Sequence, residues 1–158
     1  MIKALLNKVE ALKSALESGE IVRDVLLDQE DMLLEKQLGQ LWDGKNSEGE
    51  DISPSYLEDD YFHSRDSARA YARWKDRITH NSKRNFAAPN LCITGKFYSE
   101  LGVKLNESDI VFEGTTPFAQ DVVSKYGLNQ FGLMRSTWNE IMQENKKMIL
   151  DRVKKIIL

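Results

Sequence analysis

The segment from Leu91 to Leu133 most constrains the fold, because it interrupts a chain that is otherwise patterned for helices. Within it, apolar side chains cluster or alternate as they do in β-strands. These strand patterns cover residues 91–94, 97–105 and 110–112. Thr116 then predicts a helix start, with Pro117 in the favourable first position, and Gly127 predicts its end. One short run of strands among helices predicts an α+β fold with a small antiparallel sheet.

Helical patterns precede and follow this segment. Apolar residues recur at helical spacing from Ile2 to Leu16, and Gly19 predicts the end of this first helix. A second pattern runs from about residue 21 to 41, although residues 37–42 are equally compatible with the first strand of a hairpin. The turn of that hairpin would be residues 43–49, which we expect to be exposed. A final long helix is expected from Thr137, capped by its hydroxyl together with Glu140.

The length of 158 residues predicts one domain, since two separate cores would each be small. We expect five parts within residues 1–158. They are a helical arm (1–41), an acidic loop or hairpin (42–63), a basic helix and loop (64–84), a sheet with one helix (91–133) and a C-terminal helix (137–158). No apolar run approaches the roughly 20 residues that span a bilayer, so we expect no membrane partner.

The net charge of −3 is unevenly distributed along the chain. An acidic segment (residues 43–60) carries Asp43, Glu48, Glu50, Asp51, Asp59 and Asp60. A basic segment (residues 65–84) carries Arg69, Arg73, Arg77, Lys83 and Arg84. The first three arginines share one helix face, which predicts an anionic partner, either phosphate or carboxylates of the same or a neighbouring subunit. We expect both segments to be subunit interfaces, or the basic one to face DNA; two solvated surfaces are the alternative.

The sequence offers little for catalysis. His63, His80 and Cys92 are isolated, and no spacing indicates a metal, cofactor or nucleotide site. Cys92 lies between apolar residues, which favours a small buried side chain. We therefore expect no enzyme activity, no cofactor and no metal; a hydrolase that uses His63 and Asp59 would need a pocket that unites them.

A role in nucleic-acid binding is a second possibility. The basic segment combines arginines with Tyr71, Trp74 and His80, residue types that contact phosphates and stack on bases. Because the whole chain carries a net negative charge, most of its surface should repel a polyanion such as DNA. We therefore expect only local and non-specific contact with DNA.

Four motifs, taken in order, resemble minor virion proteins of tailed phages, of the virion morphogenesis, tail-completion or head-tail connector type. The first is residues 40–44 followed by a glycine turn, Pro54 and Tyr56. The second is Leu91 with Thr94-Gly95 and Phe97-Tyr98. The third is residues 110–112 with Thr115-Thr116, and the fourth is Lys125-Tyr126-Gly127 with Phe131-Gly132-Leu133.

This resemblance implies an α+β structural subunit without enzymatic activity. The subunit would form a homo-oligomeric ring around the DNA channel, in the neck, head-tail connector or tail-completion region. Its partners would be portal, neck or tail proteins, and it would be found in the virion and, during assembly, in the host cytoplasm. In this reading Gly95 permits a turn or bulge, so that Phe97 and Tyr98 point to opposite faces or both enter the core of one monomer. Phe131, Gly132 and Leu133 are expected to pack beneath the final helix.

Overall fold

The computed structural model describes residues 2–106, 109–114 and 116–158. The α+β class expected from the sequence is confirmed. The elements are α1 (Ile2–Glu17), α2 (Glu20–Leu26), α3 (Glu30–Trp42), α4 (Arg65–Ile78), α5 (Lys96–Ser99), β1 (Leu101–Leu105), β2 (Ile110–Gly114), α6 (Pro117–Tyr126), the 3-10 turn η1 (Leu128–Gln130), α7 (Arg135–Glu144) and α8 (Lys146–Ile157). Residue 1 of the expected arm and Thr115 of the third motif lie outside the described residues.

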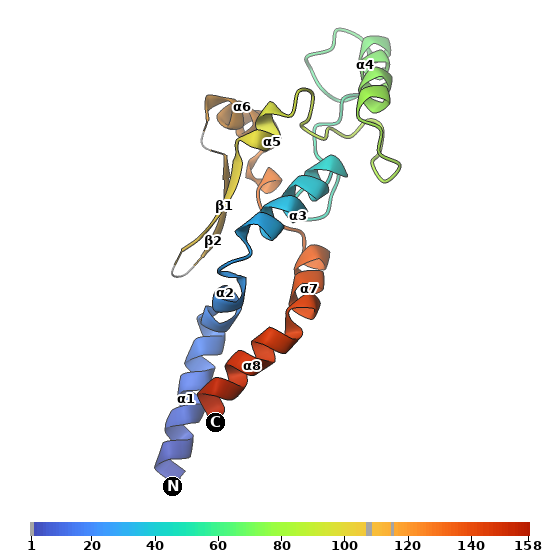
Figure 1. Ribbon diagram of the computed structural model, residues 1–158. Helices are drawn as coiled ribbons and strands as arrows, with labels where there is room; N and C mark the ends of the chain where they lie inside the picture. Colours follow the sequence, from blue (N-terminus) through green and yellow to red (C-terminus); the bar gives the residue numbers. More distant parts are fainter. Residues whose placement is uncertain (1, 107–108, 115) are drawn as a thin grey trace.

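The molecule is elongated (Figure 1). Helices α1 and α8 lie side by side at one end, where both chain termini are found, and we call this pair the stalk. Residues 20–144 form the body, in which α3 lies at the centre and packs against β1. Helix α4 lies at the end of the body farthest from the stalk, attached through long loops.

Three helices, α1, α2 and α3, are found where the sequence predicts two. Gly19 adopts φ 71° between α1 and α2, as expected of a residue just past a helix end. The pattern predicted over residues 21–41 is broken between α2 and α3, because the backbone N–H of Gln29 donates to the carbonyl of Leu26 and its side-chain amide donates to the carbonyl of Val25. Such local bonds compete with continuation of a helix.

Residues 37–42 are helical, so the hairpin alternative for them is wrong. The turn predicted at residues 43–49 is present, with Gly44 and Gly49 at positive φ. An isolated antiparallel β-bridge pairs Lys45 with Asp51. It is only partly exposed, since Gly44 and Asn46 are buried. The Asn46 Oδ1 atom accepts from the backbone N–H groups of Glu48 and Glu50, which closes the turn on itself.

The sheet is one antiparallel hairpin, in which Leu101 pairs with Gly114 and Leu105 with Ile110. The strand expected at residues 97–105 is wrong in its first part. Gly95, at φ 78°, begins the short helix α5, and the Ser99 N–H donates to the Gly95 carbonyl. Residues 91–94 are irregular rather than extended.

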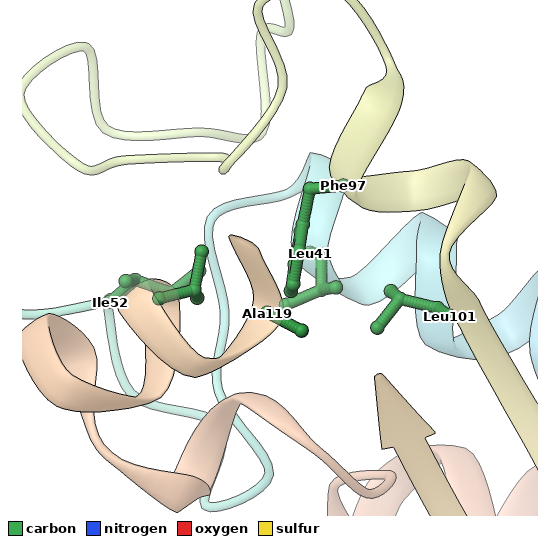
Figure 2. Packing of buried hydrophobic residues seen from close by; sticks show 6 residues of the cluster. Leu41, Ile52, Phe97, Leu101 and Ala119 are labelled. Atoms are coloured by element: carbon green, nitrogen blue, oxygen red, sulfur yellow. The ribbon is translucent and has the colours of Figure 1, made fainter. Parts of the chain in front are cut away.

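Two apolar clusters fill the body. One gathers Leu41 of α3, Ile52, Phe97 of α5, Leu101 of β1 and residues of α6 (Figure 2). The other contains Leu26, Leu33, Val103, Leu133 and Ile141. Because Leu101 and Val103 alternate along β1 and enter different clusters, the hairpin joins the two parts of the core through one face.

The helix ends are predicted correctly at α6 and incorrectly at α7. Thr116 caps α6 by accepting from the Ala119 N–H, and Gly127 ends it. The final helix begins at Arg135, two residues before the expected cap, and Thr137 is buried instead of capping. It is interrupted at Asn145, whose amide donates to the Ile141 carbonyl while its Oδ1 accepts from Gln29. The long C-terminal helix is therefore present as α7 and α8.

Candidate functional site

The acidic segment is partly used inside the molecule. Lys45 donates to Asp51 at 2.7 Å, and this hydrogen bond lowers the pKa of the Asp51 carboxyl. Lys125 donates to Asp59 at 2.5 Å, and Asn81 donates to Asp43 at 2.6 Å. The other acidic side chains of the segment are exposed, and they are Glu48, Glu50, Glu58 and Asp60. These four carboxylates are available to a partner.

The basic segment presents one cationic helix face. Ser64 and Ser67 cap α4 reciprocally, as a capping box, at the start of the expected basic helix. Arg69, Arg73 and Arg77 are exposed, and among the described residues no ion pair connects them to a carboxylate. Lys83, in the loop after α4, is also exposed. The anionic partner that the arginine spacing predicts is therefore not supplied by the acidic segment of the same chain.

Arg84 does not belong with this exposed group, and its assignment to an interface or to DNA is corrected. Its side chain is fully buried, and its guanidinium donates to Asp76 at 3.3 Å and to the backbone carbonyls of Ala88 and Thr79. No local pattern indicates this burial, because an arginine in a polar loop is usually solvated.

The second and fourth motifs serve packing inside the chain. Phe97 and Tyr98 both enter the monomer, and the Tyr98 hydroxyl donates to the Asn90 carbonyl at 2.6 Å. Burial raises the pKa of the Tyr98 phenol. Thr94, by contrast, is exposed beside Gly95. Of the two positions proposed for the aromatic rings, the intramolecular one is found.

The fourth motif is held by two glutamines of α3 that the sequence did not single out. Gln37 accepts from the Gly132 N–H at 2.7 Å and donates to the Gln130 carbonyl. Gln40 accepts from the Met134 N–H and donates to the Gly132 carbonyl. Gly132 adopts φ 105°, a conformation that favours glycine. Phe131 packs against Phe97, and Leu133 against Ile141 of α7, while Tyr126 is half-buried and Gly127 ends α6.

The stalk exposes its apolar residues. On α1 only Ala15 is buried, and on α8 no described residue is. The exposed side chains of the two helices are Ile2, Leu5, Leu6, Val9, Leu16, Met148, Leu150 and Ile157. Lys8 ties the helices together by donating to the carbonyl of Ile157 at 3.0 Å. Both helices of the stalk therefore carry apolar side chains that the rest of the described chain does not cover, and we call these side chains the apolar face of the stalk.

Of the residues considered for catalysis, only His63 and Asp59 come near each other within the described part of the chain. His63 and Asp59 line the same open hollow, but Asp59 is engaged by Lys125, and no hydrogen bond connects it to His63 within residues 2–106. His80 lies 3.6 Å from Asp76 at the surface. Cys92, expected to be a small buried side chain, is half-buried and lines a cavity.

Within the part of the chain that the structure describes, no cluster of three metal-ligating side chains forms. No helix there has the length and apolar character needed to cross a membrane. Comparison of the chain with protein-family models, curated protein sequences and solved structures returns no match.

Proposed function

We propose that the chain is a non-catalytic structural subunit of a tailed-phage virion, which associates with its own copies into a ring at the neck, head-tail connector or tail-completion region. The observation that carries this proposal is the apolar face of the stalk. Leu5 and Val9 of α1 are 60% and 54% exposed, although both belong to the apolar stripe of an amphipathic helix. Burying such side chains against a partner releases about 25 cal/mol for each Å² of apolar surface.

The occupant of this face is a second copy of the chain, for reasons of charge. Helix α8 carries five basic residues, Lys146, Lys147, Arg152, Lys154 and Lys155, against Asp151 alone. The four exposed carboxylates of the acidic segment belong to the body, in the loops between α3 and α4. The basic side of α8 and the exposed carboxylates of the acidic segment are therefore electrostatically complementary surfaces of different parts of the chain, which orients association between copies.

A contact between α8 of one copy and the acidic segment of another joins two different surfaces and is heterologous. Such contacts produce a ring when the rotation between neighbours closes, and a filament when it does not. Together with the resemblance to minor phage virion proteins, this supports a ring through which DNA passes. One side of the ring would dock on the portal or adaptor, and the other side on tail components.

Sedimentation velocity and native mass spectrometry of the purified chain test the proposal. The wild type should form a closed oligomer of one size, and the double variant Leu5→Gln and Val9→Gln should remain monomeric with unchanged circular dichroism. Leu128→Gln is the matched control, since Leu128 is 70% exposed but lies on η1. A wild type that stays monomeric at high concentration contradicts the proposal.

A charge-swap experiment tests the identity of the two surfaces. Lys154→Glu with Lys155→Glu should block assembly, as should Glu48→Lys with Glu50→Lys, because each pair places like charges opposite one another. Combining all four substitutions in one chain should restore the oligomer. In purified particles, a label on this chain should be seen at the neck by electron microscopy; its absence there rejects the virion role even if the oligomer forms.

A second function, binding of nucleic acid, is favoured by the three exposed arginines of α4 and by Trp74, which is 40% exposed on the same helix. If α4 binds DNA, affinity should fall steeply with salt, and Arg69→Ala, Arg73→Ala and Arg77→Ala together should reduce the salt dependence by about three phosphate contacts. Affinity that does not depend on these residues excludes this function for α4.

A further inference from the structure

A cavity of about 250 Å³ lies between α4, the segment before α5, and α6. Its walls are mostly aromatic and aliphatic. They include Tyr71 of α4, Leu91 and Phe97 from the segment around α5, and Phe118 and Tyr126 of α6. Three separate parts of the chain thus build one half-open, mostly apolar pocket, which is the usual character of a small-molecule site.

One cationic group is buried in this wall. Lys75 of α4 is 1% exposed, and within the described residues no group accepts a hydrogen bond from its Nζ atom. It lies on the inner side of α4 with Ala68 and Ala72, opposite the exposed arginines. A buried ammonium without a partner is unfavourable by several kcal/mol, so a protein rarely retains one unless an anion compensates it.

The charges nearby do not provide that anion. Burial lowers the pKa of Lys75, the neighbouring Cys92 acts against this shift, and the buried Arg84 lowers the pKa further. Asp76 is already paired with Arg84 at 3.3 Å and faces His80 at 3.6 Å. At the rim, Lys125 is paired with Asp59, and Lys96 lies 5.9 Å from the centroid of the Phe118 ring. Asp121 also lines the cavity but is exposed, so solvent screens it. One positive charge remains uncompensated inside.

We propose that this cavity binds a small apolar monocarboxylate, with the carboxylate on the Lys75 Nζ atom and the aromatic or aliphatic part against Phe97, Phe118 and Tyr126. Size supports this class, since an apolar cavity of about 150 Å³ holds benzene and this one is larger. A single buried cation suits a monoanion, whereas a phosphate group requires several donors. The site is independent of the stalk and of assembly.

Phenylacetate and its neutral analogue phenylacetamide are the probes, and two-dimensional NMR titration of the monomeric chain is the measurement. Phenylacetate should bind saturably and shift resonances around the cavity. Phenylacetamide should bind about tenfold to a hundredfold more weakly, because it lacks the charge-assisted hydrogen bond to Lys75. Equal affinity for the two probes, or no saturable binding of phenylacetate, overturns the proposal.

Two variants locate the charge responsible. Lys75→Met keeps the length of the side chain and should lose at least about tenfold in phenylacetate affinity. Lys96→Met is the matched control at the rim, and it should change the affinity by less than about twofold, because exposed charges contribute little. An equal loss in both variants assigns the attraction to the rim and overturns the proposal.

A readout on the wild type alone covers the case in which Lys75→Met does not fold. Cys92 lines the same cavity, so bound phenylacetate should slow its alkylation by iodoacetamide, and phenylacetamide at the same concentration should not. Equal alkylation rates with and without phenylacetate place any binding elsewhere and contradict the assignment.

Discussion

The body and the stalk are built from the same kind of amphipathic helix but use its apolar face differently. In α3 the apolar face is covered, and Leu33 and Leu41 are fully buried between the hairpin, α6 and α7. In contrast, α1 contacts mainly α8 and α2, and its Leu5, Leu6 and Leu16 remain exposed. Periodicity therefore predicts the helix in both regions, whereas burial depends on what the rest of the chain places opposite.

This difference separates residues that stabilise the monomer from residues that are free to bind. The body holds both of the main apolar clusters and the buried glutamines, while the stalk holds a single buried residue on α1. A substitution in the body should therefore change the free energy of unfolding, and one in the stalk should change association instead.

The largest contrast is expected between Phe97→Ala and Leu5→Ala. Phe97 is 2% exposed and contacts the rings of Tyr98, Phe118 and Phe131, so its removal leaves a cavity and should cost about 3–5 kcal/mol. Leu5→Ala should change the free energy of unfolding of the monomer by less than about 0.5 kcal/mol. Urea denaturation at low protein concentration measures both. A large cost at Leu5 would show that the stalk is part of the cooperative core.

Two glycines with nearly the same backbone conformation sharpen the comparison. Gly44 of the body has φ 69° and Gly19 next to the stalk has φ 71°. Alanine at either position is strained by about 1–2 kcal/mol. At Gly44 the added Cβ would lie 2.9 Å from Cγ of the buried Arg84, so overpacking adds about 1–3 kcal/mol, while nothing lies within 4 Å at Gly19. Equal losses of unfolding free energy in Gly44→Ala and Gly19→Ala would mean that the Arg84 side chain moves away from the added Cβ without cost.

The sequence predicts local features of both regions well. Gly19, Ser64, Thr116 and Gly127 are helix-end residues where their chemistry indicates, because capping depends on groups only a few residues away. The failures occur where a distant contact decides. Asn145 interrupts the last helix while bonded to Gln29, which is 116 residues away.

The candidate site was less predictable for the same reason. Arg69, Arg73 and Arg77 are exposed as their spacing indicates, but Lys75 on the same helix is buried because α6 and the segment before α5 cover its side of α4. Gln37 and Gln40 resemble surface residues of an ordinary helix. Their role depends on the backbone of residues 130–134, which no local pattern reveals.

These buried glutamines provide a polar test of the same comparison. Gln37→Met should cost about 1–3 kcal/mol, because it leaves the Gly132 N–H and the Gln130 carbonyl without their partner in the core. Gln143→Met on the exposed side of α7 is the control and should change the unfolding free energy by less than about 0.5 kcal/mol. Hydrogen exchange of the Gly132 amide, faster in Gln37→Met alone, would identify the lost bond.

The smallest effect is a pH dependence that distinguishes a body lysine from a stalk lysine. Burial lowers the pKa of Lys75 from 10.5 to about 8, so above pH 8 the unfolded chain binds a proton that the folded chain has released. Stability from this group therefore rises with pH, by about 1 kcal/mol between pH 8 and pH 9. Urea denaturation at these two pH values measures this gain in the free energy of unfolding. The Lys75→Met variant should lose the gain. The Lys13→Met variant should retain it, because the Lys13 side chain is 71% exposed in the wild type. If Lys75→Met keeps the full increment, another group is responsible and Lys75 does not carry its charge in the interior.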